Sequence, residues 1–225
     1  MNPEPGSRSN SRYGKHGEFG HKQGRWPALL EKLHERFVLE RRVRRLAGSI
    51  ADLLPETATA VDLGCGDGRI AKSISSLKPG IVLEGYDIRV RPEAVFPVLS
   101  FDGLHLPLEE NAVDAVIIVD VLHHTDDPML LMREAYRVTR KFIIIKDHRL
   151  NKPGAETLLR LMDWFGNWTR SIILPCNYWP EERWRAAWSE IGLQVDSYQT
   201  ELFLYPWPAN LVFERGLHFL VRLAK

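Results

Sequence analysis

Cysteine is scarce in this chain of 225 residues, which contains only Cys65 and Cys176. Two cysteines so placed suggest neither a disulfide framework nor a cysteine metal cluster, and we expect no bound metal. No apolar run approaches the roughly 18 residues of a membrane span, and no signal peptide opens the sequence. We therefore expect a cytoplasmic protein without a transmembrane segment.

An excess of charge of either sign is also lacking. The 30 Lys and Arg residues stand against 29 Asp and Glu residues, for a formal net charge of +1. Bulk electrostatic attraction to nucleic acid is therefore not expected, and such a partner would need a local basic patch. Hydrophobic residues at 44% and charged residues at 26% are typical of a soluble globular protein of one α/β domain.

A glycine-rich turn between a predicted strand and a predicted helix is the strongest pattern in the sequence. The apolar residues Thr57–Leu63 predict a buried strand, and helical spacing resumes at Ile70. Gly64, Gly66 and Gly68 between them permit a sharp turn and leave no Cβ to obstruct a ligand. Because amides at a helix start lack intrahelical partners, this loop is suited to a nucleoside-bearing cofactor.

The spacing of the glycines disfavours two common cofactor loops. A dinucleotide fingerprint requires Gly-x-Gly-x-x-Gly, whereas Arg69 occupies the third position after Gly66. The Gly-Lys-Ser/Thr of a phosphate-binding P-loop is absent. Asp62 precedes the glycines, where a carboxylate could attract an ammonium or order the loop, but would repel a pyrophosphate.

A second acidic residue ends the next predicted strand, Ile81–Ile88. Asp87 there could accept hydrogen bonds from both ribose hydroxyls. Residues 89–93 are too few for a crossover helix, so the usual second helix is missing before a third strand at residues 94–100. Asp102 then precedes Gly103, where it either accepts a bond from an adenine amino group or serves as an ordinary turn residue.

Polar residues follow the fourth and fifth predicted strands. The apolar run to Val119 predicts a strand covered on both faces, and Asp120 and His123 follow it. The fifth strand, Phe142–Ile145, is followed by Asp147 and His148. Because open α/β sheets place ligands at the carboxyl ends of their strands, these residues are candidates for the reaction site.

Several of these motifs together resemble a known family. Asp-x-Gly-x-Gly-x-Gly at residues 62–68 resembles motif I of class I S-adenosylmethionine-dependent methyltransferases. The segments Phe101-Asp102-Gly103 and Val121-Leu122-His123-His124 extend a resemblance to the type 11 methyltransferase domain over roughly residues 57–148. That group includes ubiquinone and menaquinone biosynthesis methyltransferases. The resemblance implies a Rossmann-like α/β fold, with a mostly parallel seven-stranded sheet, helices on both faces and an antiparallel last strand.

The resemblance also implies S-adenosyl-L-methionine as cofactor and a set of cofactor-binding residues. Gly64, Cys65 and Gly66 would pass under the methionine part, with Asp87 at the ribose and Asp102 at the adenine. Val119 and Asp120 would line the sulfonium side. Asp62, Ile88 and Gly103 complete the predicted set.

Outside this core the sequence divides into three further parts. Residues 1–26 are poor in aliphatic side chains and predict a disordered, mildly basic tail. Residues 27–55 predict a helix whose four central arginines favour a solvated face. Residues 149–225 predict two helices, two closing strands and a tryptophan- and tyrosine-rich substrate side, in which the aromatic rings either form core or line a pocket. Residues 27–225 are expected to form a single domain.

The sequence therefore predicts a methyltransferase that acts on a small-molecule acceptor, such as an aromatic or lipid-like compound. His148 and His123 are candidate bases for an oxygen or nitrogen acceptor, and Asp147 either orients His148 or is itself the base. Either histidine could instead be structural. Methylation of a carbon atom would need neither histidine. A non-catalytic cofactor-binding scaffold is the main alternative, and a nicotinamide-dependent oxidoreductase is disfavoured by the missing glycine. The acceptor atom and the oligomeric state are not determined by the sequence.

Overall fold

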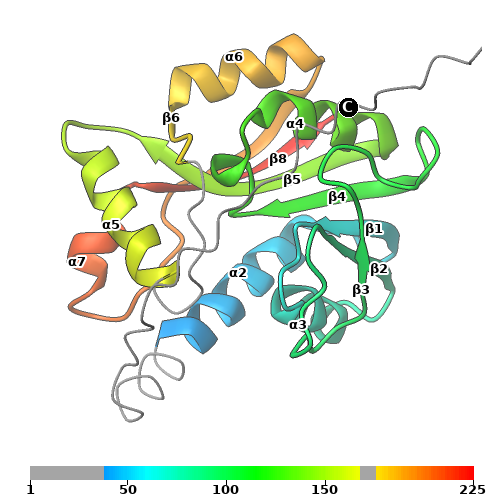
Figure 1. Cartoon of the computed structure of the whole chain (residues 1–225), viewed down its shortest axis with the longest axis horizontal. Helices are drawn as coiled ribbons and strands as arrows, with labels where there is room; N and C mark the ends of the chain where they lie inside the picture. Colours follow the sequence, from blue (N-terminus) through cyan, green and yellow to red (C-terminus); the bar gives the residue numbers. More distant parts are fainter. Residues whose placement is uncertain (1–37, 168–175) are drawn as a thin grey trace, which may run out of the picture.

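The computed structural model describes residues 38–167 and 176–225, with the side chains of residues 164–167 excepted. The predicted tail, the first part of the predicted helix 27–55 and residues 168–175 lie outside this range. The described residues form a twisted sheet with helices packed on its two faces (Figure 1). None of the described helices is long and apolar enough to span a membrane.

The sheet has the strand order β3-β2-β1-β4-β5-β8-β7. Neighbours from β3 to β5 pair in parallel, and β8 pairs antiparallel with both β5 and β7. The predicted mostly parallel sheet with an antiparallel last strand is thus confirmed. The strands are β1 Ala58–Leu63, β2 Ile81–Asp87, β3 Val98–Ser100, β4 Val113–Val119, β5 Thr139–Leu150, β7 Gln194–Gln199 and β8 His218–Ala224. A two-residue strand, β6 Trp179–Pro180, pairs with the end of β5 and was not predicted.

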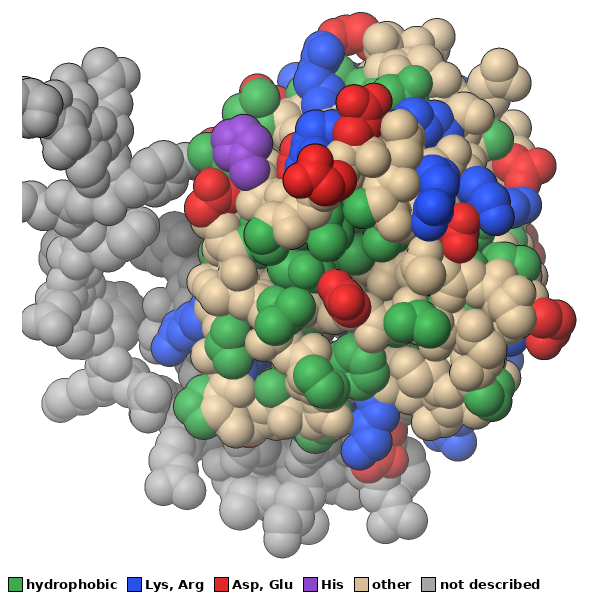
Figure 2. All heavy atoms as spheres, turned by 90° about the vertical axis from the view of Figure 1, so that its right-hand side faces the viewer, with side chains coloured by type: hydrophobic (Ala, Val, Ile, Leu, Met, Phe, Trp, Pro, Cys, Tyr) green, Lys and Arg blue, Asp and Glu red, His purple; other side chains and the backbone are tan. Residues whose placement is uncertain are grey.

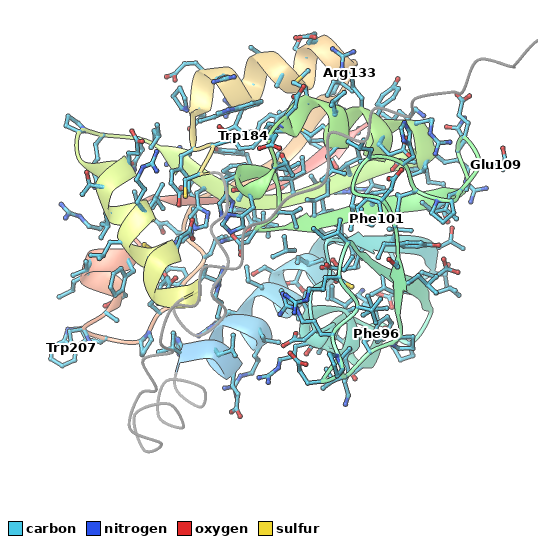
Figure 3. All side chains as sticks on the ribbon, viewed as in Figure 1. Phe96, Phe101, Glu109, Arg133, Trp184 and Trp207 are labelled. Carbon is cyan, nitrogen blue, oxygen red and sulfur yellow. The ribbon has the colours of Figure 1, made fainter. Side chains whose placement is uncertain are left out.

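Two apolar clusters cover the two faces of the sheet. Consecutive residues of β1 belong to different clusters because their side chains point to opposite faces of the sheet. Ala60 lies in the cluster that includes residues of helix α2 (Glu40–Leu53) and helix α3 (Arg69–Leu77). Val61 lies in the cluster that includes residues of α4 (Pro128–Val138) and α6 (Glu181–Ile191). The central strand β4 is buried on both sides, as its uninterrupted apolar run predicts. Trp184 of α6 (Figure 3) is a buried core residue in this second cluster, as is Trp188 of the same helix.

The missing crossover helix after β2 is confirmed. The residues between β2 and β3 form turns, and Val95 N–H donates to Asp67 O at 2.9 Å. The ring of Phe96 belongs to this segment, and a Cβ on Gly68 would lie only 2.4 Å from its Cβ (Figure 3). The segment therefore packs directly on the glycine loop. The third strand begins at Val98, later than the predicted residue 94.

The fifth strand is longer than predicted, which changes the position of the candidate residues. β5 continues to Leu150 because β8 pairs along it, with Asp147 opposite Phe219 and His148 opposite His218. Asp147 and His148 therefore lie within the strand and do not follow its end. The remaining elements are the 3-10 turn η2 (Leu122–His124), α5 (Ala155–Asn167) and the short helix α7 (Asn210–Phe213), the last of which was not predicted.

Candidate functional site

The glycine loop joins β1 to α3 in a conformation that requires glycine. Gly64, Gly66 and Gly68 have φ angles of 77°, 62° and 77°, which other residues rarely adopt. The amides of Gly64 and Cys65 both donate to Tyr86 O, at 2.7 and 3.1 Å, so the loop is tied to β2. A Cβ on Gly66 would meet only the guanidinium of Arg91, at 3.7 Å or more. The side of Gly66 that lacks a Cβ is therefore faced by a charged side chain at ordinary contact distance.

The end of β2 is joined to this loop through Asp87. Gly66 N–H donates to Asp87 Oδ2 at 2.8 Å, and Arg89 N–H donates to Oδ1 at 2.9 Å. Each carboxylate oxygen can accept a further hydrogen bond. The carboxylate is thus fixed beside the loop with acceptor capacity left for a ligand's hydroxyl groups.

Asp62 lies beneath the loop and is 2% exposed. Its Oδ2 has no hydrogen-bond partner among the described residues. Burial, together with the charge of Asp87, raises the pKa of the Asp62 carboxyl to about 7. A cationic ligand group nearby would favour the ionised form. Cys65 is directed elsewhere, since its Sγ would lie 2.8 Å from a Cβ on Gly85 of β2.

Ile88 and Gly103 lie side by side beyond β2. Ile88 is 66% exposed, and its Cγ2 would lie 3.1 Å from a Cβ on Gly103, which has a φ of 86°. Asp102 Oδ1 accepts from the amides of Leu104 and His105 at 2.7 and 2.6 Å, so this carboxylate does cap a turn. These bonds lower the pKa of the Asp102 carboxyl. Figure 2 views the side of the molecule that carries β1 to β3, where apolar and charged side chains mix.

Asp120 follows Val119 at the end of β4 and binds two cations. Its backbone is left-handed, with a φ of 55°. Arg42 of α2 donates to Asp120 Oδ2, and Lys146 of β5 donates to Oδ1. Burial would raise the pKa of Asp120, but the charges of Lys146 and Arg42 hold it well below its usual range. Asp120 is therefore an ionised hub between α2 and β5.

Asp147 organises the two candidate histidines. It accepts hydrogen bonds from the amides of Leu122, His123 and His148, at 3.1, 3.4 and 2.7 Å. His123 Nδ1 lies 2.6 Å from Asp147 Oδ1, and its Nε2 lies 3.5 Å from Asp163 Oδ2. Burial would lower the pKa of His123, but the two carboxylates raise it to about 10. His123 is thus an imidazolium at neutral pH.

His148 has the opposite protonation state. Its Nδ1 is buried 3.5 Å from Asp147 Oδ1 and 3.7 Å from Asp120 Oδ1, without a hydrogen bond within the described ranges. Burial and the Lys146 ammonium lower the pKa of His148 to about 4. The ring is therefore neutral at neutral pH and has one nitrogen able to accept a proton.

Further residues of the cluster were missed by sequence reasoning. Lys146 Nζ donates to His218 Nδ1 at 3.4 Å, and His218 Nε2 lies 2.9 Å from Phe213 O. Tyr178 donates its hydroxyl proton to Asp163, and its ring stacks on His123 with centroids 5.5 Å apart. The available signals in the sequence were Lys146, which follows the apolar run Phe142–Ile145, and Asp163, which is flanked by apolar residues on both sides.

The donor atoms of this cluster are arranged for hydrogen bonding. A tetrahedral zinc site with bonds of about 2.0–2.1 Å requires its donors about 3.3 Å apart, whereas His123 Nδ1 and Asp147 Oδ1 are separated by 2.6 Å. Asp120 already binds Lys146 and Arg42, and their charges oppose a metal dication. The arrangement is a charge-balanced network of side chains.

The sheet order and the glycine loop together define a class of protein. The class is that of class I S-adenosylmethionine-dependent methyltransferases. Its features here are a Rossmann-like sheet with an antiparallel β8, a glycine loop after β1, and the carboxylate of Asp87 at the end of β2. Residues 61–142 match the family described as "Methyltransferase domain". The buried Asp62 Oδ2, which has no hydrogen-bond partner among the described residues, and the loop of positive-φ glycines fit the family's cofactor, S-adenosylmethionine.

Named relatives act on different acceptors. The chain is 34% identical over 89 residues to a 25S rRNA (adenine-N(1))-methyltransferase of Chaetomium thermophilum, covering 40% of this chain and 15% of the relative. It is 25% identical over 170 residues to the norajmaline N-methyltransferase of Rauvolfia serpentina, covering 60% and 58%. The chain thus spans less than two thirds of each of these relatives. An S-adenosylmethionine-dependent methyltransferase from Mesorhizobium loti shares the fold, with a TM-score of 0.59, 16% identity and coverage of 79% and 96%.

Proposed function

We propose that this protein transfers the methyl group of S-adenosylmethionine to a small-molecule acceptor bound at the carboxyl ends of β4 and β5. The observation that carries the proposal is the bare loop at Gly66, whose amide is bonded to Asp87 from the neighbouring strand. The same proposal includes the expected absence of a nucleic-acid partner and a cytoplasmic location.

In this proposal the predicted residues divide the cofactor between them. Gly64, Cys65 and Gly66 provide main chain under the methionine part, and the ionised form of Asp62 attracts its ammonium. Asp87 accepts from the ribose hydroxyls. Ile88, Asp102 and Gly103 border the adenine, and Val119 and Asp120 border the sulfonium.

The chain's contribution to the reaction is mainly positional. The cofactor supplies an activated methyl group with a good leaving group, so much of the rate comes from holding donor and acceptor in line and excluding water. Where the acceptor must lose a proton, the opposite pKa shifts favour His148, which is neutral, over His123, which already carries its proton. Asp147 then acts by orienting both rings.

The test is calorimetric titration of purified protein with S-adenosylmethionine and with its demethylated product. Gly66→Val should abolish binding, because a branched side chain strains a φ of 62° and occupies the ligand side. Gly48→Val is the matched control, since a Cβ on Gly48 of α2 meets nothing within 4 Å. Equal binding by the wild type and Gly66→Val would refute the assignment of the loop, and binding without any methylated product would favour a scaffold.

RNA is a second candidate acceptor, on two observations. Two relatives are named for methylation of rRNA and tRNA. In addition, Arg41, Arg44 and Arg45 of α2 line one groove, and although Asp52 and Glu201 also line it, the arginines outnumber the acids, as a local basic patch for such a partner requires. The candidates are distinguished by incubating the purified protein with radiolabelled S-adenosylmethionine and a cell extract, and comparing the result with the extract alone. Label that ribonuclease removes indicates RNA as acceptor, and label that an organic solvent extracts indicates a small molecule.

A further inference from the structure

We propose that residues 203–213, together with the arginines of α2, dock on the surface of an anionic lipid bilayer. The inference goes beyond methyl transfer, because this docking segment includes neither the glycine loop nor the histidine cluster. None of the described helices is long and apolar enough to span a membrane, so the proposed contact is peripheral.

The docking segment carries large apolar side chains that face outward. Trp207 is 78% exposed, Leu211 64% and Phe203 58%, and Val212 is exposed as well. Figure 3 shows the Trp207 side chain at the outer edge of the molecule, directed away from the sheet. Exposed apolar groups gathered in this way mark interaction sites for proteins or membranes, whereas scattered ones need no explanation.

The fold holds Phe203 in its outward position. Its neighbours Leu202 and Leu204 are both buried in the cluster that includes residues of α2, so the side chain between them is directed away from the core. Phe203 has a φ of 52°, a left-handed conformation that bulky residues rarely adopt. Arg41 of α2 donates to Phe203 O at 3.3 Å, which ties this backbone to the helix. Phe203 is therefore presented to solvent by a fixed backbone.

Trp207 and Leu211 are brought to one side by a helical turn. Asn210 N–H donates to Pro206 O at 3.0 Å, which is the spacing of an α-helical turn, and the short helix α7 continues from it. Residues four apart in such a turn lie on the same side. The indole and the leucine side chain therefore form one apolar tip.

A basic groove adjoins the docking segment at Phe203. Three arginines of α2 line it: Arg41, Arg44 and Arg45. None of the three forms an ion pair within the described ranges. Glu201 and Asp52 also line the groove, but Asp52 is eleven residues from Arg41 on α2, which is about 16 Å along the helix axis. The end of the groove next to the docking segment therefore carries an excess of positive charge.

An anionic bilayer matches both the apolar tip and the basic groove. Tryptophan and aliphatic side chains lie at the boundary between headgroups and acyl chains, and arginines attract anionic headgroups. RNA would also attract the arginines and would stack on aromatic rings. It would leave the aliphatic side chains of Leu211 and Val212 uncovered, so the composition of the tip favours lipid.

The apolar area also favours a bilayer over a second copy of the chain. At roughly 150–250 Å² for each aromatic side chain, the exposed parts of Trp207 and Phe203 amount to about 200–340 Å². Leu211 and Val212 are smaller. A stable protein interface buries about 800 Å² on each partner. A bilayer needs no complementary surface of that size, because the tip inserts between its headgroups.

The test is co-sedimentation of the purified full chain with two kinds of vesicle, one of phosphatidylcholine alone and one of equal parts phosphatidylcholine and phosphatidylglycerol. We expect binding to the anionic vesicles, and the double variant Trp207→Ser/Leu211→Ser should weaken it by about tenfold or more. Leu77→Ser/Val82→Ser is the matched control, because it removes two side chains of similar exposure from α3 and β2 and should leave binding unchanged.

The basic groove is tested with the same vesicles. Arg44→Gln/Arg45→Gln should weaken binding to the anionic vesicles by about fivefold for each arginine near the surface. Melting temperatures verify that each variant is folded. The conservative Trp207→Phe variant gives an independent readout: brominated acyl chains should quench the tryptophan fluorescence of the wild type more than that of the variant.

The proposal is overturned if the wild type sediments with neither kind of vesicle, or if the two serine double variants lose binding equally. A dimer, or binding to polyuridylic acid, that Trp207→Ser/Leu211→Ser abolishes in the absence of vesicle binding would assign the segment to a second copy or to RNA, and would also overturn it. Calorimetric titration with S-adenosylmethionine tests the proposed function separately, so the failure of one proposal leaves the other intact.

Discussion

The protonation of His123 makes a large and testable contribution to stability. This histidine is buried between Asp147 and Asp163, and its pKa is about 10 in the folded protein against an ordinary value of 6.5. The folded state therefore binds this proton more tightly than the unfolded chain. The resulting stabilisation is fully present below pH 6.5 and is lost as the pH rises through 10.

The size of this contribution follows from the two pKa values. At about 1.4 kcal/mol for each factor of ten, it amounts to about 5 kcal/mol, to within about 1.4 kcal/mol. This is a large part of the 5–15 kcal/mol that stabilises a typical domain. Two other groups also have a higher pKa in the folded state, so they too lower the stability as the pH rises. Burial raises the pKa of Asp62 to about 7 and also raises that of the Cys65 thiol. A variant without His123 is therefore needed to isolate its part.

Urea unfolding of the wild type and His123→Gln from pH 6 to 10 measures this part. The free energy of unfolding of the wild type should fall by several kcal/mol more than that of the variant across this range. An NMR titration of the wild-type imidazoles is an independent readout if the variant does not fold, and the His123 ring should remain protonated at pH 8. Parallel pH profiles for the two proteins, or titration of His123 near pH 6.5, would refute the reasoning.

Three further predictions concern other parts of the site. Lys146→Met should lower the free energy of unfolding by about 3–5 kcal/mol, because it leaves the buried Asp120 with one cation. Urea unfolding measures this difference, and a decrease below about 1 kcal/mol would contradict the prediction. Asp87→Ala should weaken S-adenosylmethionine binding about 10-fold or more through lost hydrogen bonds to a charged acceptor, and an unchanged Kd by calorimetry would exclude its role at the ribose. Wild-type affinity for S-adenosylmethionine should rise as the pH passes upward through about 7, where Asp62 ionises, and Asp62→Asn should have a flatter pH profile over the same range.

Much of the cofactor side could be read from the sequence because its determinants are local. The run from Thr57 to Ile70 contains the strand, the turn and the helix start in consecutive residues, and three positive-φ positions require glycine whatever the tertiary context. Asp87 is placed by the parallel pairing of two strands that are adjacent in the chain. The apolar run of β4 likewise predicts its burial on both faces.

The acceptor side could not be read in the same way. Arg42, Lys146, Asp163 and His218 come from four separate elements and Tyr178 from the residues before β6, and no periodicity shows that their side chains meet. The sequence predicted that Lys146 and His148 follow the end of the fifth strand. The pairing of β8 along β5 instead places both residues within the strand, in the interior of the protein.

The two histidines illustrate the difference most clearly. As residues near the ends of apolar strands, His123 and His148 had equal claims as bases in the sequence. Their pKa values move in opposite directions because two carboxylates against His123 outweigh its burial, whereas burial and a nearby ammonium both lower the pKa of His148. Local sequence thus predicts where a cofactor would be held, whereas the proton affinity of the two histidines depends on long-range neighbours that only the packed sheet and helices bring together.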